Sequence, residues 1–424
     1  MFGNRATTRN AVIFISGEAF WGFNSSLIAS STVLAVLLSE LGASDRVIGS
    51  IGAIEAGLMV LPQIIGMYFF SSRKNRKRNL IIWHLVVMIP FLFISGGLIL
   101  FENSFPASIL KWALLTSYAC FMGSIGMIAG VWMDWLAHLF EEKIRGTLMG
   151  VAFFASALLG TAGGLAAGLI IKAVEGHAAY AILYIAAGVF ASISILTFTF
   201  VDDPADSSEA VLPKRITPAD IIYSFRESLK DANFKSFLIC RILASFGFCI
   251  IPFIAIYFKS TEGGSLSNSV IVACGAALTL GAAISNLLLG RLGDKYGHRL
   301  GVIVGTAMQV ITLAILLAGS GQTFCAIIYF CIGICASSAF ISHTNMLLES
   351  CPHEFRIAHL TVGNLIMSIP LIPAPFVAGL LAESFGLRTI FIICLMFSTA
   401  SFAWCVFLVK EPRYLRVIDV QRRK

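Results

Sequence analysis

Ionisable side chains are rare within the long apolar stretches of this sequence, and those that occur there could bind a charged solute or a proton. Glu18, Glu55 and Asp134 lie in apolar stretches of the first half of the chain, and Arg241 lies in one of the second half. An ionised side chain at the centre of a membrane helix costs about 2.5–3.5 kcal/mol on insertion scales. These residues are therefore candidates for a binding function.

Polar and aromatic residues accompany these charges. Trp21 and Asn24 follow Glu18 by about one and two helical turns, so they lie on or near its face of a helix. His343 and Asn345 lie together in an apolar stretch of the second half. The candidates for binding substrate or protons are therefore Glu18, Trp21, Asn24, Glu55, Asp134, Arg241, His343 and Asn345.

Two hypotheses assign chemistry to these charges. In the first, Glu18 or Asp134 carries a proton, because burial raises a carboxyl pKa, a nearby cation lowers it, and a conformational change switches between the two environments. In the second, Glu18 and Arg241 form a salt bridge that gates the protein and bind no proton. Glu55 is interpreted as a polar contact between helices, and a structural hydrogen-bonded role for His343 is as plausible as a titrating one.

The composition identifies an integral membrane protein. Of 424 residues, 58% are hydrophobic and 12% are charged, and the mean hydropathy is +0.87. Soluble domains are roughly half apolar and a quarter charged. The net charge of +7 lies in loops between apolar stretches, where Lys and Arg set orientation and meet lipid head groups. The sequence therefore predicts lipid, and no nucleic acid, as a partner.

Twelve stretches are long enough to cross a bilayer as helices, which need about 20 mostly apolar residues. The fold class is therefore an all-α membrane protein. The predicted spans are residues 11–38, 47–70, 80–101, 112–139, 147–171, 178–201, 234–258, 267–289, 300–318, 324–348, 360–381 and 387–409. The loops on the side of both termini hold most of the Lys and Arg residues, which predicts that both termini are cytoplasmic.

The two halves of the sequence repeat each other. The sixth span ends with VDDP at residues 201–204, and the twelfth ends with VKEP at residues 409–412. Gly168 and Gly379 are related by the same offset that aligns the loops after the fourth and tenth spans. A parallel repeat of two helical bundles, with substrate handled at their interface near mid-membrane, is typical of one group of transporters.

That offset aligns two more pairs of polar residues. It superposes the loop arginine Arg145 on Arg356, and it superposes Asp134 on Asn345. We expect one six-helix bundle in residues 1–201 and another in residues 234–410. We also expect a cytoplasmic linker in residues 202–233, which either carries a short helix at the membrane surface or is solvated throughout, and a basic tail in residues 411–424.

Residues 290–299 read GRLGDKYGHR between two predicted spans, and the interval predicts a short basic turn. Their spacing resembles the loop signature of the major facilitator superfamily, G-x-L-x-D-R/K-x-G-R/K-R/K, with His298 as the departure. The resemblance implies two six-helix bundles that rock to open a central cavity alternately to each side. It assigns a conformational switch to Gly290, Gly293, Asp294, Lys295, Gly297 and Arg299.

The glycines of the fifth span can be compared with the motif of one group within this superfamily, the drug–proton antiporters. Drug–proton antiporters of this superfamily carry a motif similar to G-P-x-x-G-G, whereas residues 160–164 read GTAGG without the proline. That difference argues against a drug exporter. Gly160, Gly164 and Gly168 are four residues apart, so we expect this face to pack closely on a neighbouring helix.

The sequence lacks the motifs of the main membrane enzymes: no phosphate-binding loop G-x-x-x-x-G-K-S/T, no G-x-S-x-G and no H-E-x-x-H occurs. Its ten cysteines show no metal-site spacing, so no enzyme activity, cofactor or metal is expected. We predict a monomeric secondary transporter of a small organic solute in a bacterial inner membrane, with protons as a candidate coupling ion. The alternative is a scaffold or assembly factor with the same fold that transports nothing.

Overall fold

The computed structural model of the chain describes residues 5–71, 75–203, 226, 229–350, 363, 366 and 369–413, and all regular elements in these ranges are helices. The first half contains α1 (Arg5–Leu27), η1 (Ser30–Leu34), α2 (Ala35–Glu40), α3 (Asp45–Ser71), α4 (Arg76–Ile82), η2 (Trp83–Met88), α5 (Pro90–Leu100), η3 (Glu102–Ser104), α6 (Ala107–Leu139), α7 (Glu142–Ala173), α8 (Ala178–Thr197) and η4 (Phe198–Phe200). The second half contains α10 (Ala232–Phe248), α11 (Ile251–Lys259), α12 (Asn268–Tyr296), α13 (Arg299–Ala318), α14 (Gln322–Ser337), η6 (Ser338–Ser342), α15 (His343–Glu349), α17 (Pro373–Phe385) and α18 (Leu387–Leu408).

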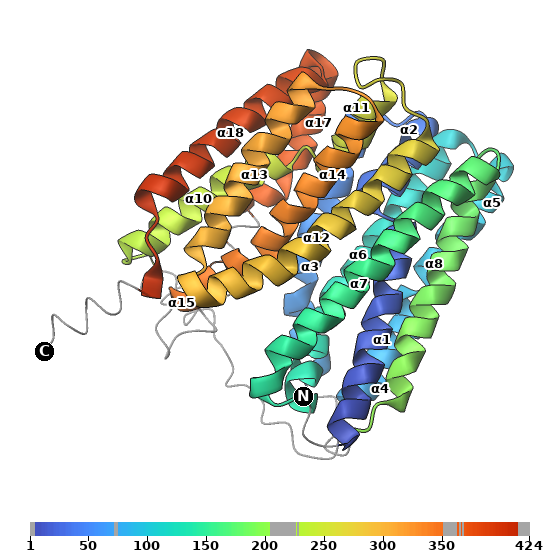
Figure 1. The fold of residues 1–424 in the computed structure, drawn as a ribbon. Coiled ribbons are helices and arrows are strands. Elements are labelled where there is room, and N and C mark those ends of the chain that lie inside the picture. The colour runs from blue at the N-terminus through green and yellow to red at the C-terminus, as the bar shows by residue number, and fades with distance from the viewer. Residues whose placement is uncertain are drawn as a thin grey trace, which may run out of the picture.

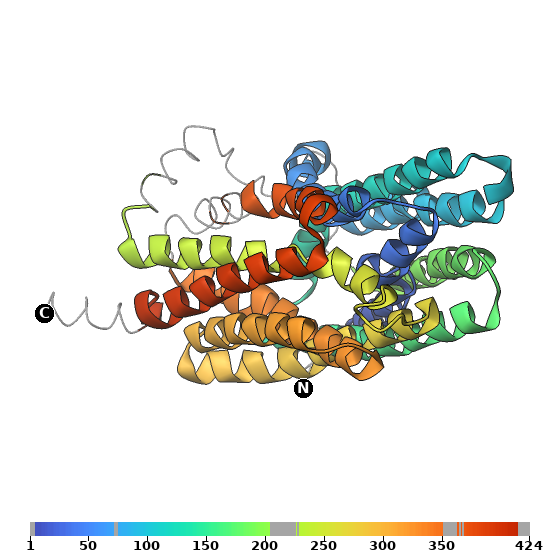
Figure 2. The ribbon, with the colours of Figure 1, turned by 90° about the horizontal axis from the view of Figure 1, so that it is seen from above.

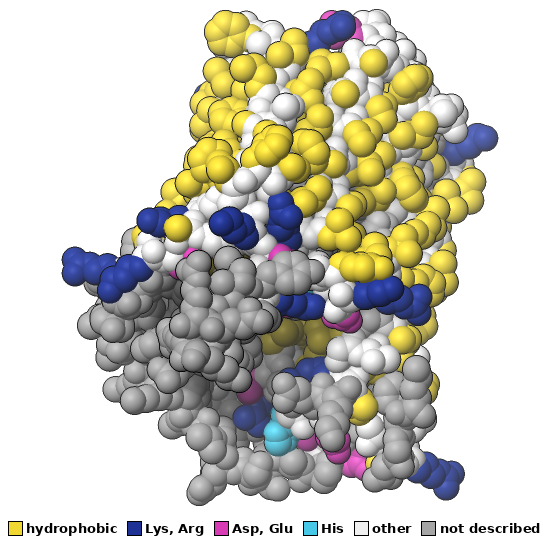
Figure 3. Space-filling view, turned by 60° about the vertical axis from the view of Figure 1, so that its left-hand side comes forward, with side chains coloured by type: hydrophobic (Ala, Val, Ile, Leu, Met, Phe, Trp, Pro, Cys, Tyr) yellow, Lys and Arg dark blue, Asp and Glu magenta, His cyan; other side chains and the backbone are white. Residues whose placement is uncertain are grey.

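The helices agree in position with the predicted spans. Among the described residues, ten helical stretches are long and apolar enough to cross a membrane. The predicted second span corresponds to α3, and the described part of the eleventh corresponds to the shorter apolar helix Ile369–Phe385. Figure 3 shows hydrophobic side chains covering the upper part of one face, with many Lys and Arg side chains below them. The chain is therefore an integral membrane protein.

The first-half helices lie on one side of the molecule and the second-half helices on the other (Figures 1 and 2). α1 begins, and α18 ends, toward the lower end of Figure 1. We call this the inner side, following the predicted orientation, and the opposite end the outer side. The predicted linker and tail lie mostly outside the described residues.

In each half, an asparagine at the start of the first span is hydrogen-bonded to the end of the last span. The Asn10 amide donates to the Asp202 carbonyl (2.7 Å) and its oxygen accepts from the Asp202 backbone N–H (2.9 Å). Asn233 bonds in the same way to the carbonyl (2.9 Å) and N–H (2.7 Å) of Lys410. This equivalence supports the internal repeat, because the two asparagines do the same work at corresponding points.

The first span of each half is broken near its middle. α1 ends at Leu27 and the chain resumes as a π-helical turn at Ser30, while α10 ends at Phe248 and α11 begins at Ile251. Pro252 explains the second break, because proline lacks an N–H and clashes with the preceding turn. Interrupted helices at corresponding positions of two repeats are the best sequence-level indication of a transporter binding site.

The expected turn at residues 290–299 is largely helical, so that prediction was wrong for most of its length. α12 continues through Gly290 and Gly293 to Tyr296, and α13 begins at Arg299. Only Gly297 has a positive φ, +92°, which an L side chain rarely adopts. Gly293 tolerates its helical position because its missing side chain leaves room for the His298 ring.

The two halves pack most closely at the outer side. Gly164 and Gly168 of α7 lie against Ala276 and Ala273 of α12, where a Cβ would be 3.1 Å and 2.7 Å from the alanine Cβ atoms. Gly379 of α17 lies against the first turn of α3 in the same way. The prediction that the α7 glycines pack closely on a neighbouring helix is confirmed. The pair Gly168 and Gly379, identified from the repeat, occupies equivalent crossings.

The same face of α7 is open at the inner side. Gly146 and Gly150 lie about five turns before Gly164 and Gly168, hence on the same face, yet a Cβ on either would meet no atom of the described residues within 4 Å. Gly290, at the inner end of α12, is equally open. Figure 1 shows α7 and α12 approaching each other at the top and separating toward the bottom. The structure is therefore closed at the outer side and open at the inner side.

Candidate functional site

Glu55 of α3 is an exposed carboxylate near mid-membrane. Its Oε2 accepts hydrogen bonds from the Ser30 hydroxyl (2.9 Å), just after the break in the first span, and from the Tyr118 hydroxyl of α6 (3.3 Å). Both partners are uncharged. An ionised Glu55 would therefore gain from a cation or a proton supplied by a ligand.

The position of Glu55 on α3 shows which way it faces. Gly52, on one side of it around the helix, contacts Pro252 of the second half, and Leu58, on the other side, contacts Gly126 of α6. Glu55 lies between these two contacts, since successive residues are about 100° apart. Its exposed carboxylate therefore opens into the space between the two halves, and the interpretation of Glu55 as a contact between helices is incomplete.

Glu18 of α1, in contrast, is 7% exposed and lies within the first half. The Trp132 side chain of α6 lies within hydrogen-bonding reach of its carboxyl group, and the Trp132 ring is 6.0 Å from Phe14. Among the described residues, no ion pair joins Glu18 to Arg241. The predicted gate salt bridge is therefore not formed in this inward-open conformation.

Trp21 and Asn24 continue from Glu18 toward the break in the first span. The Trp21 ring packs edge-on against His84 of η2, 5.9 Å between centroids. The Asn24 side chain is fully buried; its amide donates to the Trp21 carbonyl (3.1 Å) and its oxygen has no hydrogen-bond partner. The structure thus brings Glu18, Trp21 and Asn24 into one polar row along α1, as their spacing predicted.

Asp134 forms an ion pair with Arg76, the first residue of α4, at 2.5 Å. The Asp134 side chain is 60% exposed and that of Arg76 is 20% exposed. Asp134 therefore lies at the inner end of α6, away from the mid-membrane region that holds Glu55. A pair of this kind is compatible with an anchoring function and gives no support to a proton-carrying one.

Arg241 lies on the protein-facing side of α10. Phe234, Phe237 and Ser245, the neighbours of Arg241 on this face, point into the second half, whereas Lys235 and Ile239 on the opposite face are exposed. Arg241 remains partly exposed nonetheless. Its guanidinium group is therefore reached from the interior of the molecule and not from the lipid side.

His343 begins α15 and faces α10 at Phe237, one helical turn before Arg241 on the same face. The His343 side chain is 5% exposed and packs on the Phe237 ring at 5.9 Å, and its Nδ1 has no hydrogen-bond partner. Asn345 is turned elsewhere, because its amide donates to the Ile341 carbonyl at 2.9 Å. Of the predicted second-half residues, the structure thus brings together Arg241 and His343.

The loop arginines and the switch segment lie at the inner side. Arg145 donates from Nη2 to the Phe140 carbonyl at 3.0 Å and so caps the C-terminal end of α6. Arg356 lies outside the described residues. Asp294 and Lys295 are exposed on the last turn of α12, and the Lys295 ammonium lies 4.9 Å from the centre of the Tyr296 ring.

Residues after the twelfth span hold the switch segment in place, and the sequence did not identify them. Glu411 accepts the backbone N–H of Arg299 at 2.9 Å, and burial raises the pKa of this carboxyl group. Glu349 at the end of α15 pairs with Arg413 (2.6 Å) and with His298 (3.7 Å). The residue that departs from the family signature, His298, is thus buried against a carboxylate. Burial lowers the pKa of His298, and the Glu349 charge opposes that effect.

A second charged group links the two halves at the outer side. Glu40, which ends α2, accepts the Asn268 amide (2.5 Å) and lies 3.8 Å from the Lys259 ammonium, both of the second half. His177 lies between Glu40 and Glu102 and bonds to the latter. These contacts join the halves only if the outer side is closed, so they stabilise the conformation seen here.

A carboxylate of the second half also caps a helix of the first half. Glu383, near the end of α17, accepts the Arg46 backbone N–H of α3 at 3.1 Å. Negative charge is favourable at a helix N-terminus. Hydrogen bonds from the Ser44 side chain and from the Arg46 backbone lower the pKa of Glu383, so the carboxylate is ionised where it caps α3.

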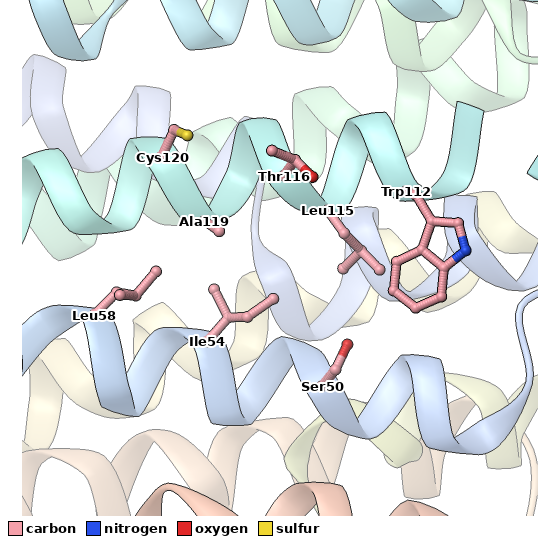
Figure 4. A pocket seen from close by; sticks show the side chains of 8 residues that line it. All are labelled: Ser50, Ile54, Leu58, Trp112, Leu115, Thr116, Ala119 and Cys120. Carbon is pink, nitrogen blue, oxygen red and sulfur yellow. The ribbon is translucent and has the colours of Figure 1, made fainter. Parts of the chain in front are cut away.

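An apolar hollow of about 390 Å³ lies between α3 and α6 (Figure 4). Ile54 and Leu58 of α3 point toward α6, and Trp112 and Leu115 of α6 point toward α3. None of the predicted site residues lines it, and Trp112 is 58% exposed. This hollow therefore opens toward lipid and is separate from the charged interior.

A further hollow of about 620 Å³ lies at the inner end of α1. Its lining residues are Arg5, Thr8, Arg9, Val12, Ile13 and Phe200. Two arginines beside apolar side chains suit the boundary between head groups and acyl chains. The position agrees with the predicted contact with membrane lipid.

Comparison with known proteins relates the second half of the chain to a family. Residues 237–423 match the family model described as Major Facilitator Superfamily. Multi-drug resistance efflux pump PmrA of Streptococcus pneumoniae serotype 4 is 25% identical over 198 residues, which are 44% of this chain and 46% of that protein. Multidrug resistance protein MdtG of Rahnella sp. is 20% identical over 161 residues, 37% of this chain and 39% of that protein. The match thus spans less than half the length of these curated relatives.

Solved structures share the fold over nearly the whole chain. The nucleoside transporter NupG superposes with a TM-score of 0.72 at 12% identity, covering 96% of this chain and 100% of that one. A bacterial homologue of the human lysosomal transporter Spinster, inward-facing and unoccupied, superposes with a TM-score of 0.69 at 14% identity, covering 96% and 98%. The second half of the chain is thus similar to the major facilitator superfamily in sequence, and its whole length shares the fold of these solved transporters.

Proposed function

We propose that the protein is a secondary transporter of a small organic solute, which works by alternating access between its two halves. The observation that carries this proposal is the divergence of α7 and α12. Gly164 packs against Ala276 at the outer side, while Gly150 faces open space at the inner side. A solute could enter from the inner side in this conformation, and closing that side while opening the other would complete the transport step.

The polar groups that face this space support transport over a scaffold role. Glu55 is exposed between the halves, and Arg241 is reached from the interior. Charges in such positions cost free energy in a membrane, and a scaffold would have no use for them. The relatives from Streptococcus pneumoniae and Lactococcus lactis are named as efflux pumps, which supports export as the direction of transport despite the missing proline in the fifth span.

Proton coupling is the second part of the proposal, with Glu18 and Glu55 as the carriers. Glu18 is buried beside an uncharged indole, which favours its protonated form until the opposite conformation solvates it. Glu55 exposes its carboxylate to the space between the halves, from which it can take up a proton. We further propose that the protein acts as a monomer in a bacterial inner membrane, with both termini in the cytoplasm.

The proposal is tested in proteoliposomes with a solid-supported membrane that records transient currents on addition of each member of a compound library. The double variant Gly164→Cys/Ala276→Cys places two thiols where the halves meet, and the single variants are its controls. We expect currents from the wild type and from the reduced double variant. Oxidation should abolish them in the double variant alone, because a disulfide would hold the outer side closed. Currents that persist after complete oxidation would contradict alternating access.

Proton coupling is tested by the pH dependence of the same currents. We expect Glu18→Gln or Glu55→Gln to remove the dependence on the pH gradient, whereas Asp134→Asn, which alters a carboxylate paired with Arg76, should retain it. Wild-type pH dependence in both glutamine variants would exclude the two glutamates as proton carriers. Absence of any current, from a folded protein and across the whole library, would favour the scaffold.

A further inference from the structure

The two halves of the chain carry charges of opposite sign inside the membrane. Away from the first and last turns, the predicted first-half spans contain Glu18, Glu55 and Asp134 and no Lys or Arg. The second-half spans contain Arg241 and no Asp or Glu. The second half therefore presents a positive surface to the interface between the halves, and its source is a single guanidinium group.

His343 adds to this positive surface. It comes from the tenth span and packs on Phe237 of the seventh, one helical turn before Arg241 on the same face. Its side chain is only 5% exposed, and its Nδ1 has no hydrogen-bond partner. A buried polar atom left without a partner costs about 1–3 kcal/mol. A ligand that accepts hydrogen bonds would satisfy this atom and the guanidinium group together.

Within the part of the chain that the structure describes, Arg241 has no counter-charge. None of the ion pairs among the described residues includes Arg241. The undescribed part of the eleventh span cannot provide one, because residues 360–381 contain no Asp or Glu. Charged side chains within a membrane pair with one another or with backbone carbonyls, or mark the pathway of a substrate. An anion from outside the chain would supply the partner that Arg241 lacks among the described residues.

We propose that the transported solute is an organic anion whose carboxylate binds between Arg241 and His343. The planar guanidinium group donates two parallel hydrogen bonds to such an acceptor, and the His343 ring donates a third. Trp21 of α1 and Trp132 of α6, which are partly exposed, provide apolar surface for the rest of the molecule. This inference rests on the proposed transport function and names its substrate class.

Matched probes separate charge from shape. Benzoate is compared with benzamide, and indole-3-acetate with indole-3-acetamide and with the cation tryptamine. Dissociation constants are measured by microscale thermophoresis on the purified full chain in detergent. We expect each carboxylate to bind more tightly than its amide, and tryptamine to bind no better than the amide. Equal or weaker binding of the carboxylates, or no binding by either of them, would overturn the proposal.

Variants place the binding at Arg241. We expect Arg241→Gln to weaken carboxylate binding by roughly tenfold to a hundredfold and to make each acid equivalent to its amide, since hydrogen bonds to a charged group are the ones lost. Arg241→Lys should retain part of the preference, and His343→Gln should lose part of it. Lys235→Gln removes the same charge from the exposed face of α10 and should change nothing. If Arg241→Gln does not fold, the Arg241→Lys and His343→Gln values decide the matter, and wild-type preference in both would refute the site.

The transport currents distinguish this inference from the function on which it rests. Currents that are abolished by the outer disulfide but are evoked only by neutral or cationic compounds would support the transport function and refute the anion site. Carboxylate binding that depends on Arg241, with no current from any compound, would support the anion site and refute the transport function.

Discussion

Replacing one glycine at the outer contact between the halves with a larger residue should open the molecule on that side. Gly164 of α7 lies against Ala276 of α12, and an added Cβ would be 3.1 Å from both the Cα and the Cβ of this alanine. Gly164→Val adds two further methyl groups to a space that is already too small. Because the obstacle is backbone and a Cβ, it cannot swing aside as a flexible side chain would.

The size of the effect follows from the cost of overpacking, which is about 1–3 kcal/mol for added methyl groups in a close-packed interior. Since this contact exists only while the outer side is closed, the cost falls on the inward-open conformation alone. It corresponds to a roughly 5- to 150-fold shift toward the outward-open conformation. A population ratio of about 99 to 1 would fall to between roughly 20 to 1 and 0.7 to 1.

The shift is measured as a distance between spin labels on the two halves at the outer side. Glu175→Cys and Glu262→Cys place labels at exposed positions before α8 and before α12, in a background where the exposed Cys120 is replaced by serine. Double electron–electron resonance should show a new population at longer distance in Gly164→Val. The matched control is Gly150→Val, on the same helix, where a Cβ would meet no atom within 4 Å.

The control should keep the wild-type distance distribution. If Gly164→Val also keeps it, the contact between α7 and α12 does not hold the outer side closed. If Gly150→Val opens the outer side equally, the effect comes from valine in α7 and not from this contact. Either result would refute the reasoning that the two glycine faces report the conformation.

Three further predictions concern stability, measured as thermal unfolding of the purified protein. Gly297→Ala should lower the melting temperature, because its φ of +92° costs an L residue about 1–2 kcal/mol. The control Gly290→Ala, in an open helical position, should leave the melting temperature unchanged or raise it. Equal effects of the two substitutions would argue against the backbone explanation. Burial lowers the pKa of His298 below 6.5, so below about pH 6.5 the unfolded chain binds a proton that the folded protein does not, and stability falls with acid. His298→Gln should therefore lose less stability between about pH 7.5 and 5.5 than the wild type, and an unchanged loss would exclude this residue as the cause. Asn10→Ala and Asn233→Ala each remove two hydrogen bonds, worth about 1–2 kcal/mol together. The loss of stability should be larger for Asn10→Ala, because Asn10 is only 6% exposed. An unchanged melting temperature in both variants would show that these hydrogen bonds do not stabilise the two halves.

Spans could be predicted from the sequence because hydropathy acts on each helix separately. The predicted span 47–70 and the helix α3, Asp45–Ser71, differ by two residues at most at either end. The turn predicted at residues 290–299 was wrong for a related reason. Glycine was taken as a turn residue, but Gly293 lies within α12, where its missing side chain leaves room for the ring of His298.

The candidate site was found in part. Glu18, Trp21 and Asn24 form one row on α1 because helical periodicity places them there. Nothing in the sequence ranked Glu55 above Glu18, and the structure exposes Glu55 between the halves while Glu18 is buried in one of them. Ser30 and Tyr118, the partners of Glu55, were missed; the serines near the middle of the first span were the available signal.

The sequence by itself determined that the chain spans a membrane, that its two halves repeat, and that acidic side chains lie within one half and an arginine within the other. These properties follow from the composition and spacing within single helices. Only the tertiary structure decided that the outer side is closed, that Glu55 faces the space between the halves and that Arg241 lies beside His343. Exposure and pairing depend on contacts between helices that are distant in the sequence, such as α7 with α12, and the periodicity of one helix carries no information about its partner.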